Sequence, residues 1–204
     1  MRRWRASPAT DLPAERPPPL RVLGIDPGSV VAGWGLVRQV GTKVELLGAG
    51  VFRPPKGELP SRLSALHEQL CAVLDSHEVD AVAVESVFHA KHARSALVLG
   101  HARGVLLLAA AQRNLPIHEY APAAVKKAVT GDGRARKDQV RKMVELLLGA
   151  GVEGPHDQSD ALAVAICHAQ VGRFAGKLAE LERSTGGRRR SGGRHPALRL
   201  KRKE

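Results

Sequence analysis

The chain has 204 residues and a formal net charge of +12 at pH 7. This length supports one well-buried domain and argues against two. The two cysteines, Cys71 and Cys167, are far apart, lie in apolar patterns and lack CxxC spacing, so neither a zinc site nor a disulfide framework is predicted.

Most of the positive charge lies at the two ends of the chain. Residues 183–204 carry nine Lys or Arg and one Glu, and residues 1–20 carry four Arg, one Asp and one Glu. The ends are rich in Pro or in Gly and Arg and lack apolar periodicity. We therefore predict a disordered Pro-rich arm over 1–20, a folded domain over 21–172, and a basic, disordered tail over 173–204. The tail's charge suits either binding to a polyanion or solubility.

Neither a signal peptide nor a membrane span is expected. Pro17, Pro18 and Pro19 stand where a signal peptide would need an apolar run. The longest apolar stretch, GVLLLAAA at 104–111, is far shorter than the roughly 20 residues of a membrane span. We expect a cytoplasmic protein without a membrane partner.

The first three predicted elements are strands. Residues 21–26 (RVLGID) have the composition of a buried strand, and residues 33–39 and 43–52 form a predicted hairpin that turns at residues 40–42. Together they predict an antiparallel meander.

Helices and strands alternate after the hairpin. Ser61 can cap a helix that ends near Ser76, and residues 80–85 (DAVAVE) then form a strand. This strand should run parallel to the first, because a helix intervenes. The remaining predicted elements are a helix over about 95–113, a strand at 117–122, a helix opening at Pro122, and helices over about 137–149 and 157–171. The order predicts an α/β fold with a mixed five-stranded sheet flanked by helices.

The predicted arrangement of strands and helices can bring four acidic residues together. Asp26 and Glu85 each end a strand, and if these strands are adjacent and parallel, both side chains emerge at the same edge of the sheet. Asp157 and Asp160 lie three residues apart in the first turn of the last helix and share one face of it. If that helix begins at the same edge, the four carboxylates converge.

Converging carboxylates repel one another and raise each other's pKa unless a cation lies among them. Hard oxygen ligands suit Mg²⁺ or Mn²⁺, and two such ions about 4 Å apart can hold an attacking water and stabilise a leaving oxygen. The pattern therefore predicts phosphodiester hydrolysis. Single residues have structural alternatives: Asp157 could cap its helix, and Asp26 could form a turn before Pro-Gly.

Three motifs resemble the RuvC family of bacterial Holliday junction resolvases. They are GIDPGS at 24–29, VESVFHAKHARSALVLGHARG at 84–104 and HDQSDALAVAICHA at 156–169. The resemblance runs from about Arg21 to Val171. GIDPG alone also resembles the phosphate loop of actin-like ATPases and sugar kinases, but those proteins need a second, duplicated domain that this length excludes.

The resemblance implies a ribonuclease H-like fold, a homodimer, and Mg²⁺-dependent nicking of two opposed strands of a four-way DNA junction. Mn²⁺ should substitute, with two ions per active site. The resemblance assigns catalysis and metal binding to Asp26, Glu85, Asp157 and Asp160, and it implies a RuvA-RuvB branch-migration complex as a partner. His156 is a further candidate to assist a metal or water, with capping or a solvated histidine as the alternative.

A second group of residues is predicted to bind DNA. In resembling proteins an aromatic at the position of Phe88 stacks on an unpaired base, although a core phenylalanine is the alternative. Residues 126–142 hold seven Lys or Arg against two Asp, and residues 131–137 (GDGRARK) are predicted to form a mobile basic loop without an apolar anchor. The resemblance places Lys126 and Lys137 at family positions that hold phosphates near the site. The predicted DNA contacts are Phe88, Lys91, Lys126, Arg134, Arg136 and Lys137.

The predicted helix at 95–113 is apolar on more than one face, beyond what packing on a sheet requires. Gly100 and Gly104 allow another backbone to approach closely, and the family dimer meets through this region. A fully buried helix in a monomer is the alternative.

Two other functions stay open from the sequence. One is a ribonuclease H-like nuclease that acts on another nucleic acid, and the other is a junction-binding protein with a degenerate site. The presence of all four acids argues against the second. The two terminal extensions and Ser86, where relatives often have Gln, depart from the family pattern.

Overall fold

The computed structural model describes residues 18–86 and 93–186, with side chains up to residue 172. The chain divides into two units, residues 1–170 and residues 171–204. The elements in chain order are β1 (Leu20–Asp26), β2 (Ala32–Val40), β3 (Lys43–Phe52), α1 (Leu59–Ser76), β4 (Ala81–Glu85), α2 (Ala93–Ala111), β5 (Ile117–Tyr120), α3 (Pro122–Thr130), α4 (Lys137–Leu148) and α5 (His156–Gly186).

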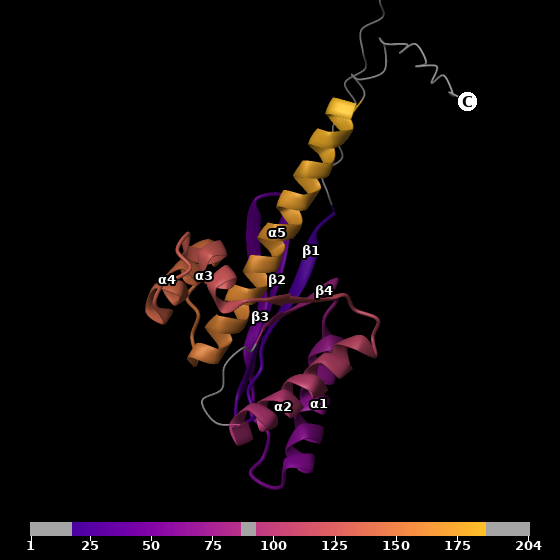
Figure 1. Ribbon diagram of the computed structural model, residues 1–204, viewed down its shortest axis with the longest axis vertical. Coiled ribbons are helices and arrows are strands. Elements are labelled where there is room, and N and C mark those ends of the chain that lie inside the picture. Colours follow the sequence, from indigo (N-terminus) through magenta and orange to yellow (C-terminus); the bar gives the residue numbers. More distant parts are fainter. Residues whose placement is uncertain (1–17, 87–92, 187–204) are drawn as a thin grey trace, which may run out of the picture. The chain divides into compact units, whose positions relative to one another are not determined.

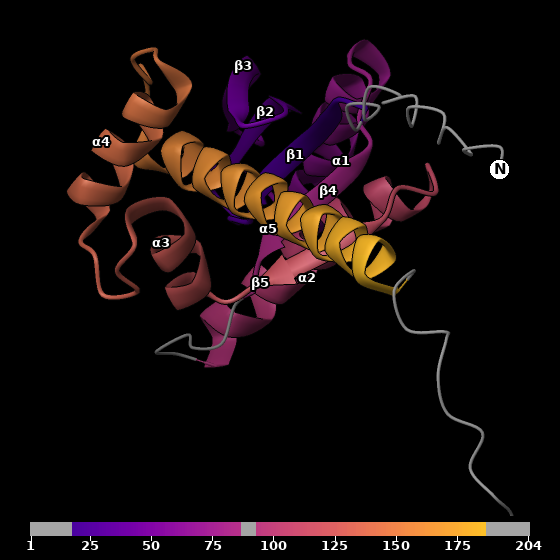
Figure 2. The ribbon, with the colours of Figure 1, turned by 90° about the horizontal axis from the view of Figure 1, so that it is seen from above.

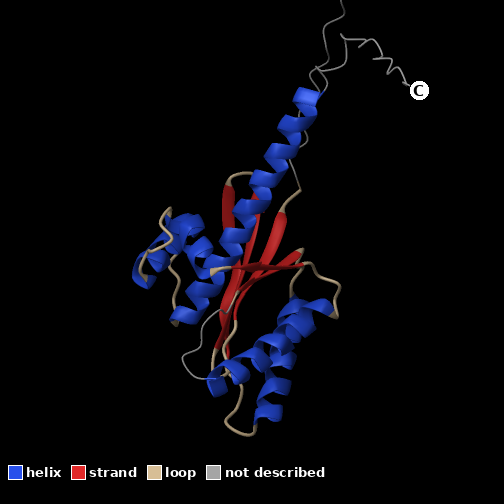
Figure 3. Cartoon of the chain, viewed as in Figure 1, coloured by secondary structure: helices blue, strands red, loops and turns tan. Residues whose placement is uncertain are grey.

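The five strands form one mixed sheet in the order β3-β2-β1-β4-β5. The strands are drawn in red in Figure 3. β1 is antiparallel to β2 and parallel to β4, as predicted from the helix that separates them in sequence. Ile25 pairs with Val84 in the parallel register. The next residue on each strand is therefore an acid, Asp26 or Glu85, and the two acids lie at the same edge of the sheet.

Alternation along the strands decides which face each side chain occupies. In β1, Leu23 and Ile25 belong to the core formed with α1 and α2, whereas Val22 belongs to the core formed with α3, α4 and α5. Because side chains alternate with a period of two, Asp26 shares the face of Val22. Figures 1 and 2 show α1 and α2 on one side of the sheet and α3, α4 and the start of α5 on the other.

The same alternation holds in β4. Val82 and Val84 pack towards α1 and α2, and Ala83 packs towards α5. Glu85, two residues after Ala83, therefore shares the face of Asp26. Two short apolar strands thus place two carboxylates on one face at one edge.

Glycines in β1 and β2 let the start of α5 lie against the backbone of the sheet. A Cβ atom added at Gly24 would lie 2.0 Å from the carbonyl oxygen of Ala161, and one at Gly33 would lie 1.9 Å from that of Asp157. Gly35 faces the same helix. Side chains at these strand positions would push α5 outward, so the glycines set how near its first turn comes to the sheet.

The structure corrects the predicted start of α1. The helix begins at Leu59 with Glu58 as its N-cap residue, and Pro60 lies in the first turn. Ser61 is therefore inside the helix and is not its cap. Proline fits the first turn because the backbone N–H that it lacks has no helical partner there.

The last helix is longer than predicted. α5 continues to Gly186, past the expected end near residue 171, so residues 173–186 are helical where we expected a disordered tail. The segment KLAELERS at 177–184 explains the difference, because most of its residues are strong helix formers. The predicted arm over 1–20 is one residue too long, because Leu20 begins β1. Residues 1–17 of the arm and 187–204 of the tail lie outside the described residues.

Arg21, the basic residue nearest to Asp26 on β1, is engaged elsewhere. Its Nη2 donates to Asp80 Oδ1 at 2.8 Å and its Nε donates to Asp80 Oδ2 at 3.0 Å, and it also pairs with Glu78. These bonds tie the start of β1 to the residue before β4. They leave Asp26, at the other end of β1, without a cation from its own strand.

A polar contact joins β5 to α5. The Tyr120 hydroxyl and His168 Nδ1 share a hydrogen bond of 2.6 Å, and the rings of His118 and His168 stack with centroids 4.2 Å apart. Burial, helped by the nearby charge of His118, lowers the pKa of His168 to about 4. His168 is therefore neutral at pH 7 and serves the packing of this face.

Candidate active site

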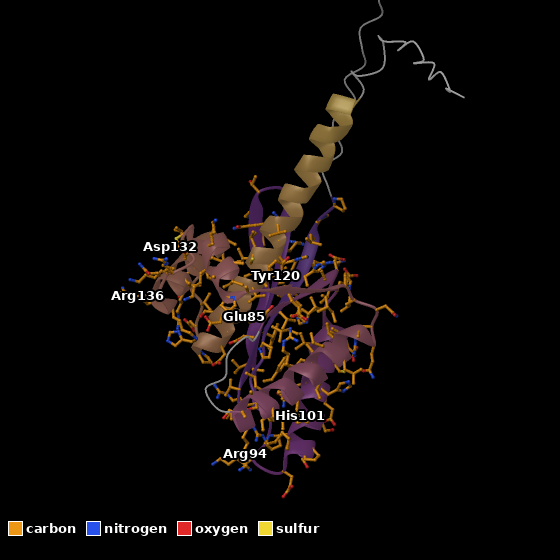
Figure 4. The ribbon with its side chains drawn as sticks, in the orientation of Figure 1. Glu85, Arg94, His101, Tyr120, Asp132 and Arg136 are labelled. Carbon is orange, nitrogen blue, oxygen red and sulfur yellow. The ribbon has the colours of Figure 1, made fainter. Side chains whose placement is uncertain are left out.

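A cavity of about 570 Å³ opens where β1 and β4 end. Three of the four predicted acids line it: Asp26 from β1, Glu85 from β4 and Asp160 from α5. Figure 4 shows Glu85 close to Tyr120, its register partner on β5. The sheet edge and the first turns of α5 thus bring together side chains that are far apart in the sequence.

The fourth acid, Asp157, lies close by but does not line the cavity. Its backbone carbonyl faces Gly33, the register partner of Asp26 on β2. Its negative charge nevertheless acts on Asp26 and raises the pKa of that carboxyl. The other three predicted acids therefore all act electrostatically on Asp26, with Asp157 outside the cavity lining.

The cavity disfavours negative charge on its own acids. Burial, followed by the charges of Asp160, Glu85 and Asp157, raises the pKa of Asp26 to about 7, although Lys137 acts to lower it. Burial, followed by the charge of Asp160, also raises the pKa of Glu85. These shifts are those of a site that lacks positive charge.

Lys137, the first residue of α4, provides part of that charge. Its Nζ donates a hydrogen bond to Asp160 Oδ2 at 2.8 Å, and this bond raises the pKa of the lysine. Within the described part of the chain, no group of three His, Cys, Asp or Glu side chains stands ready to hold a metal ion. The acids share one cavity without forming a closed ligand cluster.

Three helices begin around the cavity. Ala121, Pro122 and Ala123 at the start of α3 line it, as do Lys137 at the start of α4 and Asp160 near the start of α5. Helix N-termini carry unpaired N–H groups and partial positive charge, which favour anions such as phosphate. The uncharged residues 121–123 gave no sequence signal for this role, although Pro122 does mark a helix start.

The predicted DNA-binding residues fall into three groups. Lys126 and Lys137 line the cavity with the acids. Arg134 and Arg136 are exposed in the connection between α3 and α4. Figure 4 labels Arg136 and Asp132, which both belong to this connection. Phe88 and Lys91 lie outside the described residues.

His156 is exposed at the first position of α5 and does not line the cavity. Its backbone carbonyl accepts a hydrogen bond from the Ser159 hydroxyl at 2.8 Å. The structure does not bring its imidazole among the acids of the cavity.

The basic connection between α3 and α4 has an apolar anchor, contrary to prediction. Ala135 is 4% exposed and packs in the core with Val125 and Val140. The Asp132 carboxylate also accepts a hydrogen bond from the backbone N–H of Arg134 at 2.9 Å. One alanine among charged residues shows no periodicity, so this anchor could not be predicted from the sequence.

Comparisons with known proteins agree on one family. The family model for crossover junction endodeoxyribonuclease RuvC matches residues 22–168. A curated relative from Myxococcus xanthus with that name is 51% identical over 176 residues, which cover 85% of this chain and 90% of the relative.

Solved structures are also similar. Thermus thermophilus RuvC in complex with a Holliday junction substrate has a TM-score of 0.72 at 34% identity, covering 76% of this chain and 96% of that one. The yeast mitochondrial Holliday junction resolvase Ydc2 has a TM-score of 0.59 at 18% identity, covering 82% of this chain and 84% of that one. At that identity the second likeness concerns the fold alone. The predicted ribonuclease H-like fold is confirmed.

Proposed function

The chain belongs to the RuvC family of crossover junction endodeoxyribonucleases, and we propose that it resolves Holliday junctions by hydrolysing one phosphodiester in each of two opposed strands. The observation that carries the proposal is the cavity at the sheet edge, lined by Asp26, Glu85 and Asp160 together with Lys126 and Lys137. Acids beside lysines suit a site that must accept a phosphate and act on it.

The donor set of the cavity fits a hard divalent cation. Carboxylate oxygens are the protein ligands that Mg²⁺ and Mn²⁺ prefer. Burial, followed by the neighbouring acids, raises the pKa of Asp26, and a bound cation would stabilise its charged form. We propose that Asp26, Glu85 and Asp160, with Asp157 at the rim, hold two Mg²⁺ ions. When bound, these ions supply the charge that activates a water and stabilises the leaving oxygen.

Other residues position the DNA. Lys126 and Lys137 lie at the cavity and can neutralise the scissile phosphate, and the starts of α3 and α4 add partial positive charge. Arg134 and Arg136 extend this positive surface away from the acids. Predicted contacts from Phe88 and Lys91 would complete it. The charge of these side chains fits a DNA strand that passes over the cavity.

The protein is expected to nick a labelled four-way junction with Mg²⁺ or Mn²⁺ at paired, symmetric positions. A linear duplex and an RNA–DNA hybrid should stay intact, and a chelator should stop the reaction, because the acids alone supply no cation. Gel analysis of the labelled strands measures these products. Cleavage of the hybrid in preference to the junction would instead support a nuclease for another nucleic acid. Junction binding without nicks would support an architectural protein.

A homodimer would place two active sites on one junction, and α2 has the surface for it. Within the described residues α2 is the one helix long and apolar enough to cross a membrane by length and composition, with a mean hydropathy of 1.3. Leu97, Gly100, Gly104 and Leu108 recur at intervals of three and four, so they share one face. Both leucines are exposed, and among the described residues outside the local helix backbone no atom lies within 4 Å of a Cβ built at either glycine. We propose that this face forms a two-fold interface.

The Leu108→Glu variant is expected to be monomeric and to lose paired nicking, because two charges would face each other across the proposed interface. Sedimentation velocity and junction cleavage measure the two effects. Leu146→Glu is the matched control, since Leu146 is 72% exposed on α4, away from that face. A Leu108→Glu variant that sediments as the wild type does would contradict the proposed interface.

We also propose that the protein acts in the cytoplasm on junctions supplied by a RuvA-RuvB branch-migration complex. The support is family membership. A junction-cleavage assay with and without that complex tests the dependence.

A further inference from the structure

Lys137 makes an ion pair with an acid of the cavity. Its Nζ lies 2.8 Å from Asp160 Oδ2. Among the salt bridges of the described residues, this is the only one that involves Asp26, Glu85, Asp157 or Asp160. The Asp160 side chain is 17% exposed, whereas the Lys137 side chain is 69% exposed. The lysine therefore has more open space into which it can move away from the pair.

The charge of Lys137 acts on more than its direct partner. It lowers the pKa of both Asp26 and Glu85, opposing the effects of burial and of the neighbouring acids. One ammonium group offsets only part of the charge of several carboxylates. A divalent cation would offset more, and it would need the Asp160 carboxylate that Lys137 now contacts.

The surroundings of Lys137 allow it to leave. It is the first residue of α4, and its flexible stem can swing without unpacking the core. The cavity it lines is also the place where our proposed function puts the scissile phosphate. An ammonium released from Asp160 therefore has a second anionic partner within the same site.

We propose that Lys137 is a displaceable internal counter-ion, which pairs with Asp160 in the metal-free protein and moves to a DNA phosphate when a divalent cation binds. This inference rests on the proposed metal-dependent function. In this scheme Lys137 contacts Asp160 before the cation binds and a DNA phosphate afterwards. By thermodynamic linkage, the factor by which the bound cation changes the affinity for DNA equals the factor by which bound DNA changes the affinity for the cation.

Direct Mn²⁺ binding to the full chain without DNA tests the first half of the proposal. Free Mn²⁺ is followed by electron paramagnetic resonance during titration of the wild type, Lys137→Met, Lys137→Arg and Lys142→Met. Lys137→Met should bind Mn²⁺ roughly fivefold more tightly, the effect of removing one competing, partly exposed ion pair. Lys137→Arg keeps the charge and should bind as the wild type does.

Lys142→Met is the matched control, because it removes the same charge from an exposed position of the same helix. It should leave Mn²⁺ affinity near that of the wild type. Thermal melts check that every variant is folded. Equal Mn²⁺ affinity of Lys137→Met and the wild type overturns the counter-ion role alone. If no variant binds Mn²⁺, the proposed metal-dependent function fails, and the inference fails with it.

Junction binding tests the second half of the proposal, which is the transfer of Lys137 to a DNA phosphate. Fluorescence anisotropy measures the affinity for a labelled four-way junction with and without Ca²⁺, which supplies divalent charge as a probe. Ca²⁺ should increase the affinity of the wild type by a larger factor than that of Lys137→Met, because only the wild type gains a freed ammonium. The same factor for both proteins overturns the transfer of Lys137 to DNA.

Discussion

The Asp26→Asn variant is expected to lose junction nicking while becoming more stable than the wild type in metal-free buffer at pH 8. Asp26 lines the cavity, and burial together with three neighbouring acids raises its pKa to about 7. In the folded, metal-free protein its negative charge is therefore unfavourable. Asparagine has nearly the same shape and no charge, so it removes both the cost and the proposed metal ligand.

The stability gain should depend on pH in a defined direction. The raised pKa means that the folded state holds a proton on Asp26 from its ordinary value of 3.8 up to about 7, whereas the unfolded state releases it near 3.8. The wild type therefore loses stability as pH rises through this window, and the loss is complete above it. The full shift corresponds to about 4 kcal/mol, and we expect about 2 kcal/mol after allowing for solvent screening.

Urea unfolding of both proteins at pH 4 and pH 8 measures this effect, with junction cleavage measured in parallel. Cleavage should fall by about 10³-fold or more, as for removal of a group central to the chemistry. Asp75→Asn, an exposed acid on α1 that pairs with Arg113, is the control and should keep nicking activity. Undiminished nicking by Asp26→Asn would contradict the assignment. A gain at pH 4 as large as at pH 8 would contradict the electrostatic explanation.

The positions of Asp26 and Glu85 could be predicted because they follow from local rules. Each ends a short apolar strand, and an intervening helix makes the two strands parallel. Asp160 could be placed because its spacing from Asp157 fixes their shared helical face. For each of these acids, the position of the side chain depends on one strand or helix and on the connection next to it.

The electrostatic partner of the acids could not be predicted in the same way. Lys137 meets Asp160 across the gap between two helices, and no periodicity relates the starts of α4 and α5. Electrostatics predicts a cation among the acids, with a metal ion as the candidate. The family resemblance assigns Lys137 to DNA phosphates and does not predict its contact with Asp160.

The distance between the start of α5 and the sheet also could not be predicted from the sequence. The Gly33→Ala variant is expected to cut junction nicking by about 10²-fold, the effect of displacing catalytic groups by roughly 1 Å. A Cβ at this position would lie 1.9 Å from the carbonyl oxygen of Asp157, a backbone atom that cannot rotate away. The first turn of α5 must then move outward, and Asp157 and Asp160 must move with it.

The same clash should cost stability by about 1–3 kcal/mol, as overpacking of a well-packed interior does. Gly151→Ala is the matched control, because it makes the same substitution in the connection before α5. There, apart from its chain neighbours, no atom of residues 18–86 or 93–172 lies within 4 Å of the added Cβ. Urea unfolding, far-ultraviolet circular dichroism and junction cleavage separate a displaced helix from an unfolded protein. If α5 is displaced, the Gly33→Ala variant should be folded but should nick junctions weakly and bind Mn²⁺ less tightly than the wild type. Wild-type nicking by Gly33→Ala would mean that the distance between α5 and β2 does not control the site.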